Sequence, residues 1–393
     1  MKILHVISSG GMYGAEAVIL NLSRTLNKHG HASVLGVFSN TSNPNLQLHE
    51  AAIREGIESH LIPCNGQIDW TVATSIRQLA EATGADLIHA HGYKADVYTY
   101  FALRRTKLPF VSTCHNWLKE GLLVSCYGMV DRFVLRNYAA VIAVSDEVKA
   151  QLLKAGVRKD KIHLIRNGID LRPFEQATPS LRVAFSSAKG LTVGWIGRLS
   201  REKGADIFLR AVAIVVAEHP DARFVVVGDG PDLSMLNALM QKLDIEENVS
   251  FVGRRGDMPG VYASLDVMVS SSRQEGLPMA ILEGMASSLA LVATAVGDVP
   301  TLVLDGRTGI TVPSEDVELL AAGIARLLQD PEIRERYGKA ARKLVEEQFS
   351  AEQMAAEYLR VYADAAPENN GRANSSQRHL ASDKRDEAQE LKK

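Results

Sequence analysis

Residues 266–283 read Asp-Val-Met-Val-Ser-Ser-Ser-Arg-Gln-Glu-Gly-Leu-Pro-Met-Ala-Ile-Leu-Glu, which places a strand, a turn and a helix in succession. The apolar start is typical of a buried parallel strand, and the run 279–286 is typical of a helix with Pro278 at its first position. Glu275 and Gly276 therefore stand at a strand-to-helix turn. Free N–H groups at such a turn, with the positive end of the helix dipole, can hold a phosphate or a leaving-group oxyanion.

Two glutamates frame this turn. Glu283 stands within the helix, roughly 7.5 Å along its axis from Pro278 at about 1.5 Å per residue. Glu275 and Glu283 are therefore expected to contact different parts of an extended ligand, one a sugar and the other a ribose, with the N–H groups of Gly276 and Leu277 near a phosphate. The alternative is an ordinary acid in a first helical turn and an ordinary surface glutamate.

A second motif, upstream, offers positive charge. Arg198 and Lys203 follow a strand-like run at 192–196, so they are expected at the carboxyl end of a strand, where open α/β sheets bind ligands. Both can neutralise a diphosphate, and Gly197 and Gly204 permit close approach of the backbone. The alternative is two solvated basic residues on an exposed turn.

Strand-like runs alternate with helical periods along the chain, which predicts an α/β protein of parallel βαβ units. The strands form two series, at 3–7, 33–38, 86–89, 110–113 and 141–144, then at 191–196, 224–227, 250–252, 266–269 and 291–294. Two Rossmann-like, doubly wound parallel-sheet domains facing a central cleft are expected. The predicted divisions are an N-terminal domain at 1–170, a linker at 171–190, a second domain at 191–350, a helix at 351–366 and a disordered tail at 367–393.

Composition supports this organisation and excludes several classes of protein. The 393 residues are 46% hydrophobic, enough for two cores, and the net charge of -2 gives no global basic field for binding nucleic acid. The three cysteines have no Cys-x-x-Cys spacing, which argues against a zinc site or a disulfide scaffold. No apolar run approaches the roughly 18 residues of a membrane span, and the first is too short for a signal peptide, so a cytoplasmic protein is expected.

Two further residues follow predicted strands. His115 comes after the run 110–113 and is expected at the rim facing the cleft, although a lone histidine is more often structural. Arg254 comes after 250–252 and either flanks a nucleotide base or belongs to a solvated turn.

Glycines 10, 11 and 14 follow the first strand and resemble half of a dinucleotide-binding fingerprint. The next strand ends at 34–40 without the acid that such a site needs, and no Gly-Lys-Ser/Thr follows. Gly11 is therefore expected to approach a donor phosphate or the acceptor.

His89 and His91 alternate along a strand end and would point the same way, as metal ligands do. No third ligand is apparent in the sequence, and no Asp-x-Asp pair stands at a strand end. The two are interpreted as rim or packing residues, and no metal site is expected.

Taken in order, these motifs resemble the retaining glycosyltransferases of family 4 (glycosyl transferases group 1), which have the GT-B fold. The resemblance covers nearly the whole chain and rests on the glycine loop, His115, Asn167-Gly168-Ile169-Asp170, Gly197-Arg198-Leu199, Lys203-Gly204, Gly228-Asp229-Gly230-Pro231, and the glutamates at 275 and 283.

The resemblance implies roles for the catalytic candidates. Arg198 and Lys203 would contact the donor diphosphate and stabilise the charge of the departing nucleotide, while His115 would position donor and acceptor near the sugar. Glu275 would contact hydroxyls of the sugar and Glu283 those of the ribose. The mechanism favoured for the fold is a front-face substitution without a metal or another cofactor.

The expected activity is transfer of a sugar from a nucleoside-diphosphate sugar to a glycan or lipid-linked acceptor hydroxyl, in polysaccharide or glycoconjugate biosynthesis. Residues 117–144 mix apolar and basic side chains, which fits either a core helix or contact with the inner face of a membrane. Two alternatives stay open: a sugar-nucleotide 2-epimerase of the same fold, and a non-catalytic nucleotide-sugar binding protein.

Overall fold

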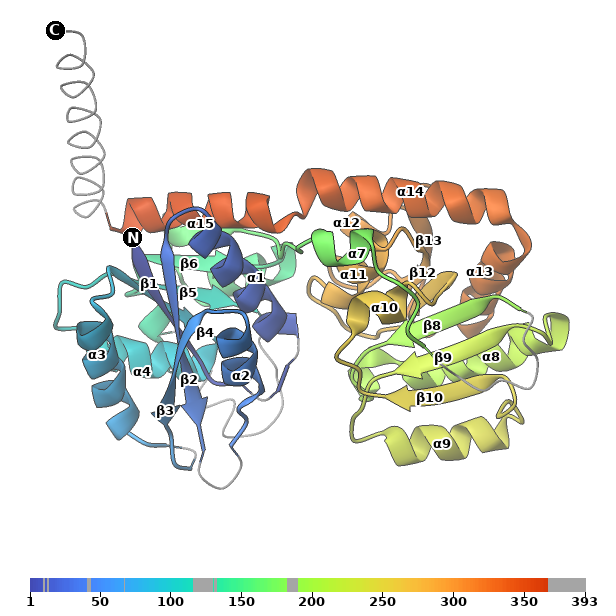
Figure 1. The fold of residues 1–393 in the computed structure, drawn as a ribbon, viewed down its shortest axis with the longest axis horizontal. Helices are drawn as coiled ribbons and strands as arrows, with labels where there is room; N and C mark the ends of the chain where they lie inside the picture. The colour runs from blue at the N-terminus through green and yellow to red at the C-terminus, as the bar shows by residue number, and fades with distance from the viewer. Residues whose placement is uncertain are drawn as a thin grey trace, which may run out of the picture. The chain divides into compact units, whose positions relative to one another are not determined.

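The computed structural model describes residues 1–366 except positions 10, 13, 41–43, 67, 116–129, 131–132 and 182–189. The chain divides into two compact units. Unit 1 consists of Met1–Ile165 with Met354–Lys393, and unit 2 consists of Arg166–Gln353 (Figure 1). The predicted tail at 367–393 and much of 117–144 lie outside the described residues.

Unit 1 is built on a seven-stranded parallel sheet in the order β3-β2-β1-β4-β5-β6-β7. Its strands are β1 (Lys2–Ile7), β2 (Ala32–Ser39), β3 (Glu58–Pro63), β4 (Leu87–His91), β5 (Phe110–Cys114), β6 (Ala140–Ala143) and β7 (Ile162–Leu164). The central strands β1 and β4 are buried along almost their whole length, because helices cover both faces of a parallel sheet.

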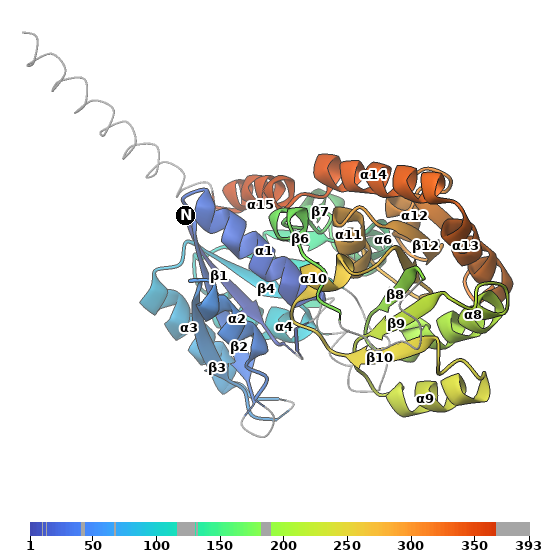
Figure 2. The ribbon, with the colours of Figure 1, turned by 45° about the vertical axis from the view of Figure 1, so that its right-hand side comes forward.

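The helices described for unit 1 come from both ends of the chain. They are α1 (Gly14–Lys28), α2 (Gln47–Arg54), α3 (Thr71–Thr83), α4 (Tyr93–Leu103), α6 (Asp146–Lys154), η1 (Lys159–Lys161) and α15 (Ala351–Ala365). From the last of these, Tyr358 and Tyr362 are fully buried against the sheet, where Tyr358 bonds Thr113 on β5 and Tyr362 bonds His89 on β4. Figure 2 shows α15, in red, beside α1 and the unit 1 strands.

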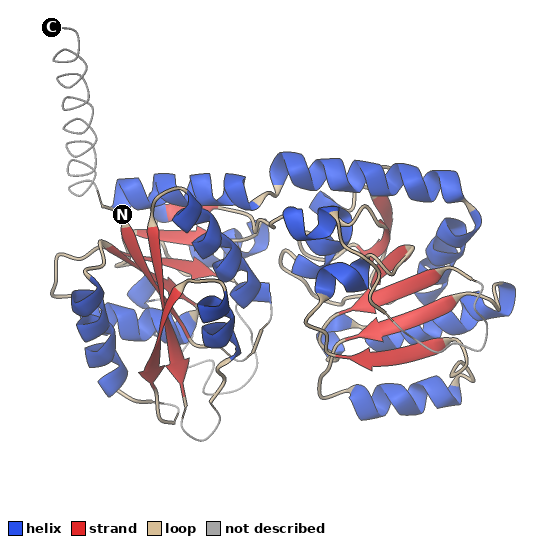
Figure 3. Cartoon of the chain, in the orientation of Figure 1, coloured by secondary structure: helices blue, strands red, loops and turns tan. Residues whose placement is uncertain are grey.

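Unit 2 is built on a six-stranded parallel sheet in the order β10-β9-β8-β11-β12-β13. The strands are β8 (Thr192–Ile196), β9 (Arg223–Val227), β10 (Val249–Gly253), β11 (Val267–Ser270), β12 (Ala290–Thr294) and β13 (Gly309–Val312). Around them lie α7 (Arg172–Glu175), η2 (Arg201–Lys203), α8 (Ala205–Glu218), α9 (Leu233–Lys242), α10 (Met258–Tyr262), α11 (Met279–Ala286), α12 (Val299–Leu302), α13 (Val317–Gln329) and α14 (Pro331–Gln348). Figure 3 shows strands in red among helices in blue in both units.

The expectation of two parallel-sheet α/β domains is confirmed, while some details differ. The sequence predicts a linker at 171–190, whereas the structure changes unit between Ile165 and Arg166 and forms α7 inside that range. The sequence predicts Pro278 at the first position of its helix, whereas in the structure Pro278 is the N-cap of α11 and Met279 is the first helical residue. Three strands absent from the sequence prediction, β3, β7 and β13, are all edge strands.

In the described part of the chain, no helix combines the length and the apolar character that crossing a bilayer would require.

Candidate functional site

Unit 2 has a topological switch point between β8 and β11. From β8 the sheet continues through β9 to β10 on one side, and from β11 through β12 to β13 on the other. The carboxyl ends of the two strands beside a switch point are the usual ligand position in an open α/β sheet. The sequence candidates of 197–204 and 271–278 lie on the loops that follow these two strands.

The two loops are joined by an ion pair. The Nζ of Lys203 donates to both carboxylate oxygens of Glu275 at 2.7 Å, and the hydroxyl of Ser272 donates to Oε1 at 2.7 Å. The Glu275 side chain is 7% exposed and that of Lys203 is 30% exposed. Lys203 thus brings a positive charge with solvent access to a carboxylate that its neighbours have almost covered.

At two positions beside these loops the backbone approaches so closely that only glycine fits, one of them on the loop after β12. Gly204 has φ +67°, and a Cβ there would lie 2.0 Å from the carbonyl oxygen of Ser271. Gly297 has φ +53°, and its Cβ would lie 1.9 Å from the carbonyl oxygen of Glu275. Ser271 reinforces the contact, because its hydroxyl donates to the carbonyl of Gly204 at 2.6 Å. The carboxylate of Glu275 is therefore held on a packed backbone, as a preorganised site requires.

Glu283 lies in a different environment, on α11. Its Oε2 accepts a hydrogen bond of 2.8 Å from the hydroxyl of Tyr262, at the end of α10. Burial raises the pKa of Glu283 from 4.5 to about 7, and the bond from Tyr262 acts in the opposite direction. The carboxyl group is therefore poised to exchange a proton near neutral pH, and it can either donate or accept a hydrogen bond.

The other candidates of unit 2 follow different strands, some at the switch point and one farther along the sheet. Gly197 continues β8 and bonds Val227 on β9, and the exposed side chain of Arg198 follows it. The carbonyl of Gly276 accepts from the N–H of Asp298 at 3.2 Å, and the buried Leu277 precedes α11. Arg254 is exposed after the edge strand β10, two strands away from β8.

Two candidates belong to unit 1. Gly11 is buried after β1 with φ +151°, and its N–H donates to the hydroxyl of Ser9 at 3.3 Å. His115 follows β5 directly and is partly exposed. Gly10 and Asn116 lie outside the described residues.

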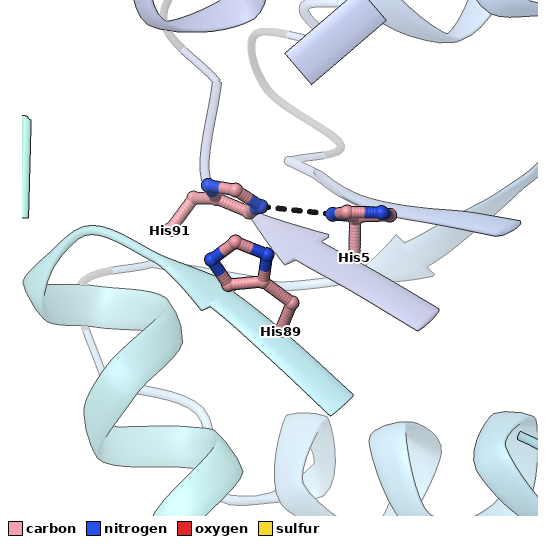
Figure 4. A group of neighbouring side chains, drawn as sticks. All are labelled: His5, His89 and His91. Atoms are coloured by element: carbon pink, nitrogen blue, oxygen red, sulfur yellow. Dashed lines mark hydrogen bonds between the residues drawn. The ribbon is translucent and has the colours of Figure 1, made fainter. Parts of the chain in front are cut away.

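A cluster of buried histidines in unit 1 includes one that the sequence did not single out. His5 on β1 is the register partner of His89 on β4, and Ile7 is the partner of His91. One ring nitrogen from each of His5, His89 and His91 lies within 4.8 Å of the other two. Figure 4 shows His5 and His91 facing each other across a hydrogen bond, with the ring of His89 beside them. His5 stands 84 residues before His89, and only strand pairing brings them together.

The nitrogens of this cluster are occupied by hydrogen bonds. Nδ1 of His5 lies 3.1 Å from Nε2 of His91, whose Nδ1 lies 3.3 Å from Nε2 of His115. Both nitrogens of His89 bond hydroxyls at 2.7 Å, one of Tyr362 and one of Thr113. Only Nε2 of His5, within these three rings, is buried without a partner. Three imidazoles can ligate a metal, but here a metal would replace bonds that already exist.

Burial also determines the charge of these rings. It lowers the pKa of His5 to about 3 and that of His115 to about 4, and it holds the pKa values of His89 and His91 well below the ordinary range. All four imidazoles are therefore neutral at physiological pH.

Comparison with known proteins gives two family matches. The model of the glycosyl transferases group 1 matches residues 182–344, and the model of Glycosyltransferase Family 4 matches residues 12–172. Together these two regions include every candidate residue named above except His5, Gly10 and Gly11.

Curated relatives and solved structures agree with those matches. N-acetyl-alpha-D-glucosaminyl L-malate synthase of Bacillus anthracis is 26% identical over 371 residues, covering 91% of this chain and 94% of the relative. The lipopolysaccharide core biosynthesis mannosyltransferase LpcC of Rhizobium leguminosarum bv. viciae is 30% identical over 247 residues, covering 61% and 68%. Anabaena Alr3699/HepE in complex with UDP-glucose superposes with a TM-score of 0.77 at 22% identity, covering 92% of this chain and 99% of that one.

Proposed function

The chain belongs to the family 4 glycosyltransferases of the GT-B fold, and from that membership we propose that it transfers a sugar from a nucleoside-diphosphate sugar to an acceptor hydroxyl, retaining the anomeric configuration. The reaction uses no metal and no cofactor other than the donor itself. The acceptor is a glycan or a lipid-linked molecule of a glycoconjugate pathway, which leaves room for peripheral contact with a membrane.

The observation that carries this proposal is the pair of Lys203 and Glu275 at the switch point. A diphosphate needs cations, and a sugar needs a fixed acceptor of hydrogen bonds from its hydroxyls. The two loops present both kinds of group 2.7 Å apart. In the donor complex, the ammonium of Lys203 turns towards the diphosphate with Arg198, while Glu275 stays on its loop to receive the sugar hydroxyls.

Glu283 serves the other end of the donor in this proposal. Its carboxyl group lies more than one helical turn into α11, away from Glu275, and binds the ribose hydroxyls. The solved structures support the donor class, since Anabaena Alr3699/HepE has been crystallised in complex with UDP-glucose.

The bond changes of the proposed transfer balance without a covalent enzyme intermediate. The bond from the anomeric carbon to the diphosphate oxygen breaks, and the bond from that carbon to the acceptor oxygen forms on the same face. The acceptor proton passes to the departing phosphate oxygen. Arg198 and Lys203 stabilise the diphosphate as its negative charge grows, which is the electrostatic contribution that lowers such a barrier.

The experiment that tests the donor site is a thermal-shift screen of UDP, GDP and ADP and their common sugar conjugates, with and without divalent metal. We expect the nucleotides of one base to raise the melting temperature of the protein, because a ligand that binds only the folded state stabilises it. The increase should be the same in the presence of a chelator. The Arg198→Ala variant should lose most of the shift, and Arg336→Ala, an exposed arginine on α14, should keep it. The absence of a shift with every nucleotide would refute the proposed donor site.

Incubation of the protein with the identified sugar nucleotide, without acceptor, distinguishes a glycosyltransferase from a sugar-nucleotide epimerase. Slow release of free sugar and nucleotide supports a transferase that slowly hydrolyses its donor when no acceptor is present. A new sugar nucleotide would instead identify an epimerase.

A further inference from the structure

A line of hydrogen-bonded imidazoles leads from the interior of unit 1 to the histidine after β5. It runs from His5 through His91 to His115, with contacts of 3.1 Å and 3.3 Å between ring nitrogens. His5 and His91 are 0% and 4% exposed, and His115 is the member that reaches the surface. The rings of neighbouring members stack, at centroid distances of 5.4 Å and 5.6 Å.

A neutral imidazole carries one N–H and one lone pair. Burial keeps these three rings neutral, so every nitrogen-to-nitrogen contact needs a donor on one side and an acceptor on the other. Only two arrangements of the protons satisfy both contacts, because the choice at one ring determines the choice at the next.

The inner end of the line distinguishes the two arrangements. If the protons point inward, His5 carries its proton on Nε2, a buried nitrogen without a partner. If they point outward, His5 donates from Nδ1, and its Nε2 holds only a lone pair. A buried N–H without an acceptor is rarer in proteins than an acceptor without a donor. The outward arrangement is therefore the stable one.

We propose that His5 and His91 are positioning residues that hold His115 as the tautomer protonated on Nδ1, with its Nε2 accepting from His91. His115 then offers an N–H donor at the end of β5 and has no lone pair free to act as a base. The part of this inference that concerns catalysis rests on the proposed function. It makes His115 a donor of a hydrogen bond to a sugar or acceptor oxygen, and it leaves the departing phosphate to take the acceptor proton.

The direct test is nitrogen NMR of the full chain labelled with 15N in its histidines, which needs no substrate. We expect His5, His91 and His115 to show the Nδ1–H pattern of shifts and couplings near pH 7. An Nε2–H pattern at His115 would overturn the proposal.

Metal analysis of the protein as purified is a second test, because a metal would use the same lone pairs. We expect substoichiometric zinc, copper, iron and nickel. One equivalent of a transition metal per chain, with shifted His5 and His91 nitrogens, would overturn the hydrogen-bonded line and make the cluster a metal site.

Two variants of His91 test the catalytic part. In His91→Asn, the side-chain amide stands where Nδ1 was and still donates to Nε2 of His115, whereas His91→Leu cannot donate. We expect the leucine variant to lose about tenfold or more in kcat with little change in KM for the sugar nucleotide, since a wrong tautomer disables a positioned histidine. The asparagine variant should recover most of that loss. Equal losses in both variants would refute the positioning role.

Failure of the two proposals can be told apart. If no sugar nucleotide binds or reacts while NMR gives Nδ1–H at His115, the proposed function is wrong and the tautomer assignment stands. If transfer proceeds normally while NMR gives Nε2–H, the reverse holds.

Discussion

At the scale of single residues, the two glutamates of the site differ in how they hold their charge. Glu275 accepts hydrogen bonds from the side chains of Lys203 and Ser272. Among the side-chain donors described for it, Glu283 accepts a hydrogen bond only from the hydroxyl of Tyr262. The site therefore contains one carboxylate with a cationic partner and one carboxyl group kept near its titration point by burial.

Glu283 makes its own contribution to the pH dependence of stability. Its pKa is about 7 in the folded protein and near its ordinary value of 4.5 when unfolded, so the folded state binds more protons between these values. The contribution of Glu283 to the free energy of unfolding should therefore fall as pH rises from about 4.5 to 7, by up to roughly 3 kcal/mol, and stay level above pH 7. The buried histidines, whose pKa values are lowered, act in the opposite direction below about pH 6.5, so the Glu283 contribution is measured as the difference between the parent and a variant. Glu283→Gln should remove that fall, so that the variant gains in melting temperature over the parent at pH 8 but not at pH 4.5. Glu318→Gln, an exposed change on α13, is the control. A constant difference between parent and Glu283→Gln across this range would contradict the raised pKa.

Removing the side chains of the donor site should separate transfer from binding. Glu275→Ala is expected to lower kcat more than it lowers nucleotide affinity, because it deletes the acceptor for sugar hydroxyls but leaves the cations. Arg198→Ala is expected to reduce both, because it deletes a diphosphate contact. Calorimetric titration with the selected nucleotide and initial rates with its sugar conjugate measure the two effects. Negligible effects of both changes would show that the site has been assigned to the wrong residues.

The sequence predicted where these residues lie in the fold better than it predicted their surroundings. Glu275 and Lys203 both follow strands, so their placement at one sheet edge follows from the parallel arrangement. The raised pKa of Glu283 comes from its burial, which the hydrogen bond from Tyr262 opposes, and no spacing in the sequence encodes that environment. His5 was missed for the same reason, since its neighbours lie on another strand.

At the scale of elements, the glycines that end loops near the site make a sharp prediction. Gly297→Ala places a Cβ 1.9 Å from the carbonyl oxygen of Glu275, in addition to the cost of a positive φ. Gly253 also has a positive φ, +67°, but nothing lies within 4 Å of its missing Cβ. Gly253→Ala should therefore cost only about 1 kcal/mol of stability, and Gly297→Ala several-fold more. Urea denaturation of both variants measures this. Equal losses of stability in the two variants would mean that the loop of Glu275 moves to accommodate the added Cβ at little energetic cost.

The strands that the sequence missed share a physical cause. β3 consists of exposed and partly buried residues with one fully buried position, Ile62. β7 and β13 contain three and four residues and lie at edges as well. An edge strand has one neighbour and needs fewer apolar residues, so it lacks the continuous apolar run that marks an interior parallel strand.

The segment 317–348 contains two helices. α13 ends at Gln329, and α14 begins at Pro331 with Asp330 as its N-cap, whose Oδ1 accepts from the N–H of Ile333 at 2.9 Å. Proline cannot continue a helix but suits its first position. These two adjacent residues are a boundary signal that the apolar period alone does not contain.

At the scale of the whole molecule, the two units should respond separately to ligand and mutation. The candidate donor groups of 197–204 and 271–283 belong to unit 2, whereas Tyr362 completes unit 1. In scanning calorimetry, the selected nucleotide should raise one transition and leave the other nearly unchanged. Tyr362→Phe removes the partner of Nδ1 of His89 and should lower the other transition, by about 1–3 kcal/mol of stability. One transition that responds equally to both changes would show that the units unfold as one.

The general architecture was accessible from the sequence because it depends on repeated local patterns. Alternating strands and helices predicted two parallel sheets, and the order of glycines, basic residues and glutamates predicted the family. The limits of the units were less accessible, because the segment after Ile165 contains Pro173 and Pro179 and no sustained period, yet its first part folds with unit 2 as α7.

The return of α15 to unit 1 has a consequence for synthesis on the ribosome. His89 is hydrogen-bonded to Tyr362, and Thr113 is hydrogen-bonded to Tyr358. Both tyrosines belong to α15 and are translated only after unit 2. At about 5–20 residues per second, roughly 10–40 s pass between emergence of Ile165 and emergence of Tyr362. During that interval the nascent N-terminal sheet has an uncovered polar patch, while unit 2, continuous in the chain, can complete itself. Synthesis of α15 is therefore expected to complete unit 1, and nascent chains stalled before α15 should be the ones that chaperones retain.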